Sequence, residues 1–254
     1  MPNLPRFFSF AFFALFLVIG LWSYSDYGVS ADEATQRGIG ETSLSYVNRV
    51  IPLPFLDRPA PIDSPAASIF ETQRDRAYGV AFELPAEYLI QVFGMKDAQA
   101  FDFRHLLNFL LFYLAVYFFY RLLFIRYQNQ TIALLGAALL VLSPRIFGDA
   151  FFNDKDLVCL SLFLIASFTL VKWLTEPNYK SLIAHAFVCA LAIDVRIMAV
   201  ILPVLTIVVV PLWQKGQGLK IKTIISQLAL YCICLILLII AFCLGYGQIL
   251  WAIS

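Results

Sequence analysis

Long apolar runs alternate with short polar connections along almost the whole of this chain. A helix that crosses a membrane needs about 20 mostly apolar residues. The stretches that come close to this length are 7–24, 106–125, 132–147, 157–174, 182–213 and 224–250. The stretch 182–213 is too long for one straight span and contains Asp194 and Arg196, so we predict two short helices that turn near these residues. The pattern therefore predicts an all-α polytopic membrane protein with about seven transmembrane helices.

The first apolar stretch has two interpretations. Positions 29–31 resemble the small-residue cleavage site of a signal peptide. However, the apolar core of 7–24 is longer than a usual signal-peptide core, and the cleavage-like site lies several residues beyond its end. We therefore expect an uncleaved anchor.

Composition supports this fold class and excludes others. Hydrophobic residues make up 61% of the chain and charged residues 14%, whereas soluble domains have roughly 45–50% apolar and about 25% charged residues. The net charge of +1 gives none of the strong basic character that nucleic-acid-binding proteins show, so we expect no nucleic-acid partner. All five cysteines lie in apolar runs, which argues against a disulfide or zinc framework.

The short connections differ in charge between the two sides of the membrane. If the N-terminus is inside, the short inner connections hold eight basic residues and the short outer ones hold three. Cytoplasmic loops carry an excess of Lys and Arg. We therefore expect a cytoplasmic N-terminus, with the acidic connections on the extracytoplasmic face.

One long outer loop, 25–104, separates the first helix from six further transmembrane helices in 105–254, and we expect a single membrane domain. This loop holds 12 of the 17 acidic residues. Its hydrophobic pattern predicts short surface helices at 32–50, 68–78 and 84–93. Five prolines between 51 and 65 predict an extended linker.

Asp32 and Glu33 follow the first helix by a few residues. One interpretation is a pair of acids stabilised by the positive end of a helix dipole. The other is a carboxylate held at the membrane surface, where it acts as a general base or binds a metal. Both interpretations stay open at this point.

A second charged segment, 143–156, connects the third and fourth helices on the outer side, and a minimal turn needs far fewer charges. Pro144 ends one helix, and Asn153 with Asp154 can cap the next. Cationic side chains can hold a phosphate, and carboxylates can position it or bind a metal. The candidates in this segment are Arg145, Asp149, Asn153, Asp154, Lys155 and Asp156.

Three further positions have a functional and a structural interpretation. Arg196 is a candidate phosphate ligand, or forms a mutually satisfied pair with Asp194 at a surface turn. Arg104 and His105, at the outer mouth of the second helix, meet an anionic lipid head or serve as interfacial anchors. We expect the other histidine, His185, to be a structural polar residue.

These features together resemble the C superfamily of membrane glycosyltransferases (GT-C). It includes the protein O-mannosyltransferases and the lipid A aminoarabinose transferases, which are grouped with glycosyltransferase family 39. The segments that carry the resemblance are DYGVSADEATQRG (26–38), YGVAFELPAEYL (78–89), RHLLNFLLFYLAVYFFYRL (104–122), LLGAALLVLSPRIFGDAFFNDKD (134–156) and AIDVRIMAV (192–200). The stretch 143–156 is the most specific part.

The resemblance implies an inverting transfer of a sugar from a polyprenyl-phosphate donor to a lipid, protein or glycan acceptor, outside a bacterial plasma membrane. By similarity, Asp32 is the catalytic base and Glu33 its neighbour. Asp149 and the run 153–156 belong to the second acidic motif, and Arg196 is a candidate for the carrier phosphate. Members differ in their use of metal, so a divalent metal stays open and no other cofactor is expected.

Family members usually continue beyond the point where this chain stops, so we expect a fragment, a truncated gene product or a minimal module that ends after the seventh helix. Two alternatives follow: a non-catalytic scaffold descended from such an enzyme, and a transport or lipid-binding module of the same fold. A transport module would line a path through the bilayer with charges, whereas the charges here gather on the outer side.

Overall fold

The computed structural model describes residues 4–56, 79–96 and 98–245, and every regular element in these residues is helical. This confirms the all-α prediction. The helices are α1 (Leu4–Ser23), α2 (Ala31–Val50), α4 (Glu83–Val92), α5 (Ala98–Tyr127), α6 (Gln130–Val141), α7 (Pro144–Phe152), α8 (Asp156–Thr175), α9 (Tyr179–Val195), the 3₁₀ helix η1 (Ile197–Val200), α10 (Ile201–Gly216) and α11 (Ile221–Gly245).

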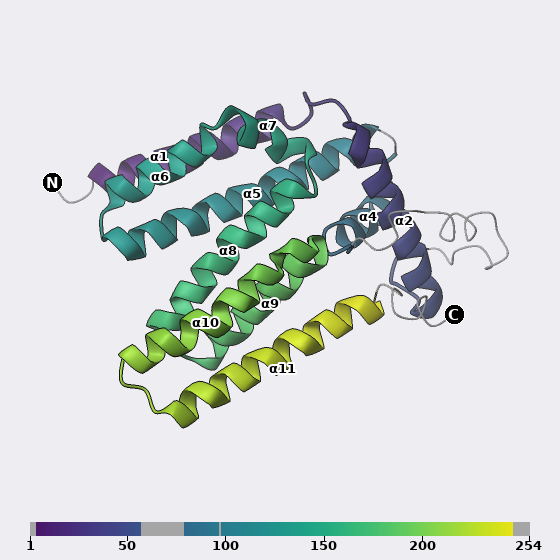
Figure 1. The fold of residues 1–254 in the computed structure, drawn as a ribbon. Helices are drawn as coiled ribbons and strands as arrows, with labels where there is room; N and C mark the ends of the chain where they lie inside the picture. Colours follow the sequence, from purple (N-terminus) through teal and green to yellow (C-terminus); the bar gives the residue numbers. More distant parts are fainter. Residues whose placement is uncertain (1–3, 57–78, 97, 246–254) are drawn as a thin grey trace.

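From α5 onward the long helices lie beside one another, and the chain reverses direction between α5 and α6, between α8 and α9, between α9 and α10, and between α10 and α11 (Figure 1). Five helical segments are long and apolar enough to cross a membrane: α1, α5, α8, η1 with α10, and α11. The pair α6–α7 makes a sixth candidate. Helix α9 has 17 residues and ends at the predicted break near Arg196, where η1 begins. The described residues thus form a polytopic membrane protein.

The α6–α7 pair departs from the sequence-based expectation. We expected one helix over 132–147 and a connecting loop over 143–156, but α6 ends at Val141 and 144–152 forms a second helix, bent by 66° from the first. Pro144 is the first residue of α7. A proline suits this position, because its fixed φ angle fits a helix start and its missing N–H has no partner to lose there. The proline thus begins a helix as well as ending one.

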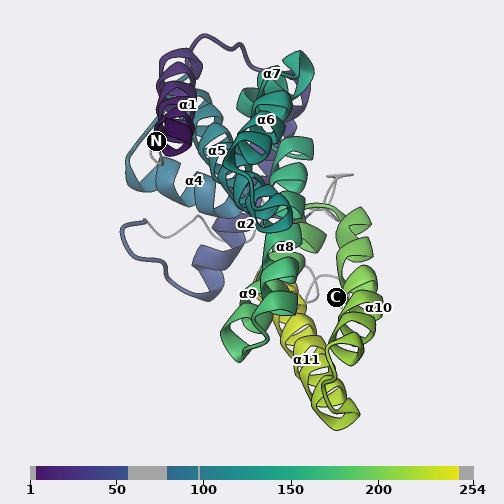
Figure 2. The ribbon, with the colours of Figure 1, turned by 90° about the vertical axis from the view of Figure 1, so that its left-hand side faces the viewer.

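Helices α2 and α4 cross one end of the bundle of long helices (Figure 1, Figure 2). They confirm that 32–50 and 84–93 are helical, as expected, while their placement on a membrane surface stays a prediction. The helix expected at 68–78 and most of the proline-rich linker lie outside the described residues. Helix α5 begins at Ala98 rather than at 106, so the outer loop is shorter than expected and Arg104 lies inside a helix.

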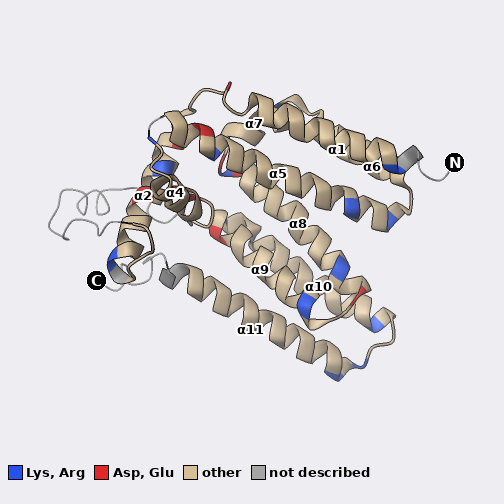
Figure 3. Cartoon of the chain, turned by 180° about the vertical axis from the view of Figure 1, so that it is seen from behind, with Lys and Arg blue, Asp and Glu red and all other residues tan. Residues whose placement is uncertain are grey.

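The two ends of the bundle differ in charge. Acidic residues gather where α2 and α4 cover the long helices, while the opposite end carries mostly Lys and Arg (Figure 3). We call the first of these the acidic end and define it by Glu33 of α2, Glu83 of α4, Asp154 of the α7–α8 turn, Asp156 of α8 and Asp194 of α9.

An aromatic core lies directly beneath the acidic end. The Phe109 ring of α5 stacks on the Phe151 ring of α7 with centroids 5.3 Å apart. Tyr27, in the segment that enters α2, stacks on the other side of Phe151 at 4.4 Å. Stacked rings of this kind add packing energy beyond simple burial. They fix the entry to α2 and the end of α7 relative to α5, and so position the charged residues that follow.

Candidate active site

Arg104 is the centre of a buried charged network at the acidic end. Its side chain is 1% exposed and donates from Nη2 to the carboxylates of Glu83 and Asp154. Glu83 begins α4, and Asp154 lies in the turn between α7 and α8. A buried guanidinium is stable only when it is paired and hydrogen-bonded. Arg104 therefore ties three separate segments together at one point.

The two carboxylates around Arg104 carry more negative charge than one guanidinium neutralises. Burial raises the pKa of the Glu83 carboxyl to about 7; Arg104 opposes this shift and Asp154 adds to it. Burial likewise raises the pKa of Asp154, again against Arg104, and the charge of Glu33 adds to the increase. Crowding therefore favours the protonated form of both carboxyl groups relative to exposed ones.

Glu33 and His105 form a second buried pair beside this network. Nε2 of His105 lies 2.7 Å from Oε1 of Glu33, and Nδ1 lies 3.2 Å from the carbonyl oxygen of Tyr24. Both ring nitrogens therefore face acceptors, and a neutral ring can donate only one of the two hydrogen bonds. The second hydrogen bond needs a proton shared within the His105–Glu33 pair.

Glu33 also stabilises the start of α2. Its Oε2 accepts a hydrogen bond of 2.6 Å from the backbone N–H of Ser30, as in a capping box. The helix-cap interpretation of the acidic pair is thus correct for Glu33, but the same carboxylate also binds His105. Through Glu33 and Asp154, the structure brings the two acidic motifs of the sequence together.

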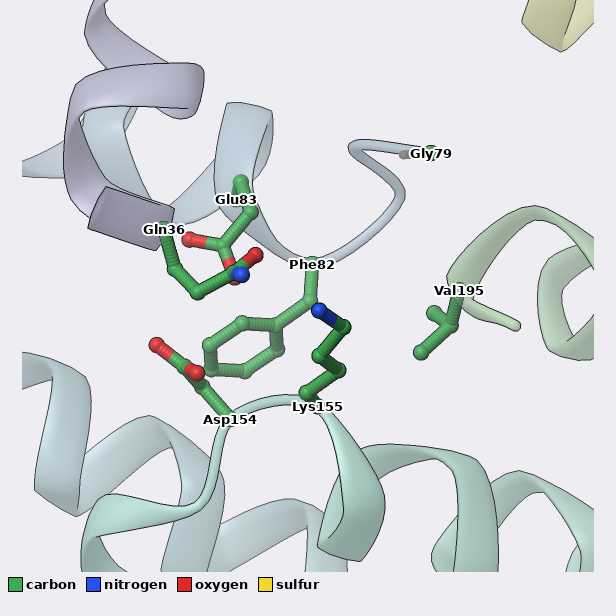
Figure 4. Close-up of a pocket in the computed structure, with 7 residues that line it drawn as sticks. All are labelled: Gln36, Gly79, Phe82, Glu83, Asp154, Lys155 and Val195. Atoms are coloured by element: carbon green, nitrogen blue, oxygen red, sulfur yellow. The ribbon is translucent and has the colours of Figure 1, made fainter. Parts of the chain in front are cut away.

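A small pocket opens beside the network (Figure 4). It leaves about 10 Å³ for the centre of a water molecule, close to the minimum for holding one water. Gln36 and Glu83 reach into it from α2 and α4, and Asp154 and Lys155 reach it from the α7–α8 turn (Figure 4). The pocket is polar on these sides and is closed by Phe82, Gly79 and Val195.

Asp32 differs from its neighbour. Its side chain is exposed, and within the described part of the chain it has no hydrogen-bond or ion-pair partner. The carboxylate lies on the outer face of the first turn of α2, one residue from the buried Glu33. It is thus held in place by its helix while its oxygens are left to meet a ligand from outside.

The remaining predicted site residues lie along α7 and the following turn, and they pair with one another rather than with Arg104. Nε of Arg145 lies 3.8 Å from Oδ2 of Asp149 in an exposed ion pair. Oδ1 of Asn153 accepts a hydrogen bond of 2.8 Å from the N–H of Asp156 and so caps α8. Asp154 turns inward instead.

Arg196 forms an ion pair with Asp156, at the start of α8. Asp194 does not pair with Arg196: its Oδ2 accepts a hydrogen bond of 2.8 Å from the backbone N–H of Ala81. The mutual pair considered from the sequence is therefore wrong. Asp194 and Arg196 are only two positions apart, but they contact different segments of the protein. The reason is that the chain turns sharply between α9 and η1.

Arg104 and His105 are buried among acidic partners of the same chain, and neither faces outward as an interfacial anchor would. Glu83, the other partner of Arg104, is not predicted by any local pattern of the sequence. Glu83 stands in the quoted segment 78–89, but its nearest charged partners are 21 and 71 residues away, and no local pattern indicates them. A single acid at the start of an amphipathic helix was the only available signal.

No group of three or more His, Cys, Asp or Glu side chains in the described residues is arranged to hold a metal ion. The acids of the network instead surround the guanidinium of Arg104. The oxygen atoms of Asp149 and Asp156, near the network, are of the type that divalent metals prefer.

The helices and this network define the class: a polytopic membrane protein with a charged site at one end of its bundle. The sequence matches the dolichyl-phosphate-mannose-protein mannosyltransferase family over residues 85–242, more than half of the chain, and the chain belongs to this family. No curated protein and no solved structure matches the chain. Membership identifies a membrane glycosyltransferase family with a lipid-linked sugar donor. The matched residues include Arg104, His105, the segment 143–156 and Arg196, and begin after Glu83.

Proposed function

We propose that this protein transfers a sugar from a polyprenyl-phosphate carrier to an acceptor on the extracytoplasmic face, with inversion at the sugar carbon. The observation that carries the proposal is the position of Asp32. This exposed carboxylate is fixed one residue from Glu33, at the edge of a buried network that includes both acidic motifs. A general base must have this combination of fixed position and access to the acceptor.

The reaction is a single displacement. An acceptor hydroxyl or amine attacks the anomeric carbon while Asp32 takes its proton. The bond between that carbon and the phosphate oxygen breaks, and polyprenyl phosphate leaves with the electron pair. A phosphate leaving group needs neutralisation of charge more than protonation. The cations proposed for that role are Lys155, which lines the pocket, Arg196, which pairs with the adjacent Asp156, and Arg145, which pairs with Asp149 on α7.

The carrier chain needs an apolar place next to this site. A groove of about 440 Å³ lies between α1 and the α6–α7 pair, lined by Phe12, Leu15, Phe16, Ile19, Ala138, Val141, Leu142, Pro144 and Phe147. Helix α7 contributes both Phe147 to the groove and Asp149 to the charged segment. We propose that part of the isoprenoid chain lies in this groove, with its phosphate toward the outer end of α7.

The test compares two acidic residues in the same loop. Asp32→Asn removes the proposed base but keeps the shape of the side chain, and Asp26→Asn removes an equally exposed acid just before α2. Purified protein in lipid nanodiscs is supplied with a polyprenyl-phosphate mannose labelled in the sugar, together with membrane extract as a source of acceptors. We expect transfer to fall by about 10²–10⁴-fold in Asp32→Asn and to stay within about twofold in Asp26→Asn.

Equal transfer by wild type and Asp32→Asn would contradict the role of Asp32. Binding of the donor by wild type, with neither transfer nor slow hydrolysis, would instead support the alternative of a non-catalytic lipid-binding module.

A further inference from the structure

The segment that leads into α4 is fastened to the end of α9 by one side chain. Oδ2 of Asp194 accepts the backbone N–H of Ala81 at 2.8 Å, and the Asp194 carboxylate also accepts the backbone N–H of Val80. Asp194 is the last residue but one of α9. Two backbone N–H groups of the segment before α4 thus bind one carboxylate of α9. The two segments lie more than 100 residues apart in the chain.

Gly79 makes this contact possible. A Cβ atom at position 79 would lie 1.9 Å from the carbonyl oxygen of Asp194 and 2.5 Å from its Cγ. Real Cβ atoms do not approach backbone that closely, so any larger residue would push the segment away. Gly79 and Val195 line the same pocket as Glu83, and Figure 4 shows them across it from Glu83 and Gln36.

The opposite side of α4 meets another glycine. A Cβ atom at Gly40 of α2 would lie 3.0 Å from the carbonyl oxygen of Glu83 and 3.3 Å from its Cβ. The backbone of Glu83 is therefore confined between α2 on one side and the segment held by Asp194 on the other. Val80 links the two, because its carbonyl oxygen accepts the N–H of Leu84 at 2.9 Å in the first turn of α4.

We infer that Asp194 is a positioning residue. By holding the N–H groups of Val80 and Ala81, it places the start of α4 so that Glu83 reaches Arg104 and Asp154 at the pocket. Arg196 belongs to a separate contact with Asp156 and does not share this task. The expected effect of Asp194 on catalysis rests on the proposed function. Its expected effect on the position of α4 does not.

The first readout needs no activity. Ala86 of α4 is 1% exposed, and in an Ala86→Cys background the thiol reports opening of this helix to a water-soluble maleimide. The native cysteines lie in apolar stretches, and protein without Ala86→Cys gives the background. We expect Asp194→Ala to speed labelling by about tenfold or more, because losing the contact frees the segment for local opening. Asp194→Asn, which keeps an acceptor oxygen, stays within about threefold, as does the control Glu176→Ala, which removes an exposed acid between α8 and α9.

The second readout is sugar transfer by the same variants without the added cysteine. A displaced site residue lowers the rate steeply, so we expect a loss of about 10–100-fold in Asp194→Ala and substantial rescue in Asp194→Asn. Unchanged labelling in Asp194→Ala overturns the inference, as does faster labelling with full transfer. If wild-type protein transfers no sugar, the proposed function fails and labelling alone decides the role of Asp194. If Asp194→Ala is not recovered folded, Gly79→Ala takes its place, with the same expected and overturning results.

Discussion

The chain has two histidines, both fully buried, in two very different surroundings. His105 lies at the acidic end between the Glu33 carboxylate and the Tyr24 carbonyl. His185, on α9, lies between two hydroxyl groups: Nε2 is 2.8 Å from Oγ1 of Thr206 and Nδ1 is 3.0 Å from Oγ1 of Thr169. Burial alone therefore does not distinguish a functional histidine from a structural one.

The partners make the distinction. Hydroxyl groups donate as well as accept, so a neutral His185 ring satisfies both of its neighbours. Thr206 donates its own hydrogen to the carbonyl oxygen of Leu202 and accepts from Nε2 of the ring. The hydroxyl of Thr169 lies 3.0 Å from both Nδ1 and the carbonyl oxygen of Ala166, so its one hydrogen serves these two acceptors. The result is a closed, uncharged link between helices α8, α9 and α10. The surroundings of His105 instead contain ionisable groups and a pocket, so protons and charges there can respond to a ligand.

Removing the buried cation Arg104 should have the largest effect on stability and on transfer. Arg104→Met leaves Glu83 and Asp154 buried without their guanidinium, and breaking a buried pair costs about 3–5 kcal/mol. We expect the free energy of unfolding in detergent micelles to fall by that amount and transfer to be lost. For stability, Arg145→Met is the matched control, because its ion pair is exposed and contributes about 0–1 kcal/mol. Equal losses of unfolding free energy in the two variants would contradict the network.

Exchanging each histidine tests the comparison itself. Both His105→Gln and His185→Gln disturb buried hydrogen bonds, which costs about 1–3 kcal/mol of stability. Only His105→Gln should lower transfer, by about 10–100-fold, because only His105 shares a proton with a residue of the proposed site. A comparable loss of activity in His185→Gln, at matched folded fraction, would show that the contrast between the two sites is wrong.

The pH dependence of stability should report Glu83. Its pKa rises from 4.5 in the unfolded chain to about 7 in the folded protein, so the folded state binds more protons between these values. The contribution to stability is therefore present below pH 4.5 and is lost as the pH rises through about 7. Thermal midpoints between pH 5 and pH 8 should fall more steeply for wild type than for Glu83→Gln, with exposed Glu176→Gln behaving as wild type. Parallel slopes for wild type and Glu83→Gln would refute this assignment.

Filling the groove should have the smallest effect. Ala138 is half-buried and lines it, whereas Leu139 is 65% exposed and does not. Ala138→Phe should raise the KM for a long-chain donor by about tenfold. The larger side chain displaces a few CH₂ groups of the donor from the groove, and each displaced CH₂ group loses about 0.8 kcal/mol of burial free energy. A short-chain donor and the control Leu139→Phe should show little change. An unchanged KM for the long-chain donor would exclude this groove as the site of the carrier chain.

Local sequence patterns predicted most of the fold. The apolar runs located the long helices, the acids after the first helix located the start of α2, and Asp194 with Arg196 marked the break before η1. Pro144 was harder, because the same residue that stops one helix favours the start of another. This ambiguity concealed α7 within an expected loop.

The site was only partly predictable. Asp32, Glu33 and 143–156 were selected because charges stand out beside apolar runs. The contact between the two acidic motifs was not visible in the sequence. Tertiary packing brings Arg104 to Glu83 and Asp154, which lie 21 and 50 residues away in the chain. Glu83 could not be predicted for the same reason. For Asp194, the sequence suggested a pair with Arg196, whereas its partners are backbone N–H groups of another segment.

The most direct test of the central claim is to locate the bound donor. A polyprenyl-phosphate sugar analogue with a photoactivatable diazirine on the sugar is irradiated with the protein in nanodiscs, and the modified peptides are mapped by mass spectrometry. The account predicts adducts within 30–36, 79–87 or 149–156, suppressed by excess unmodified donor. Competable adducts confined to the loops at the opposite end of the bundle, or beside His185, would contradict the assignment of the acidic end as the site of sugar transfer.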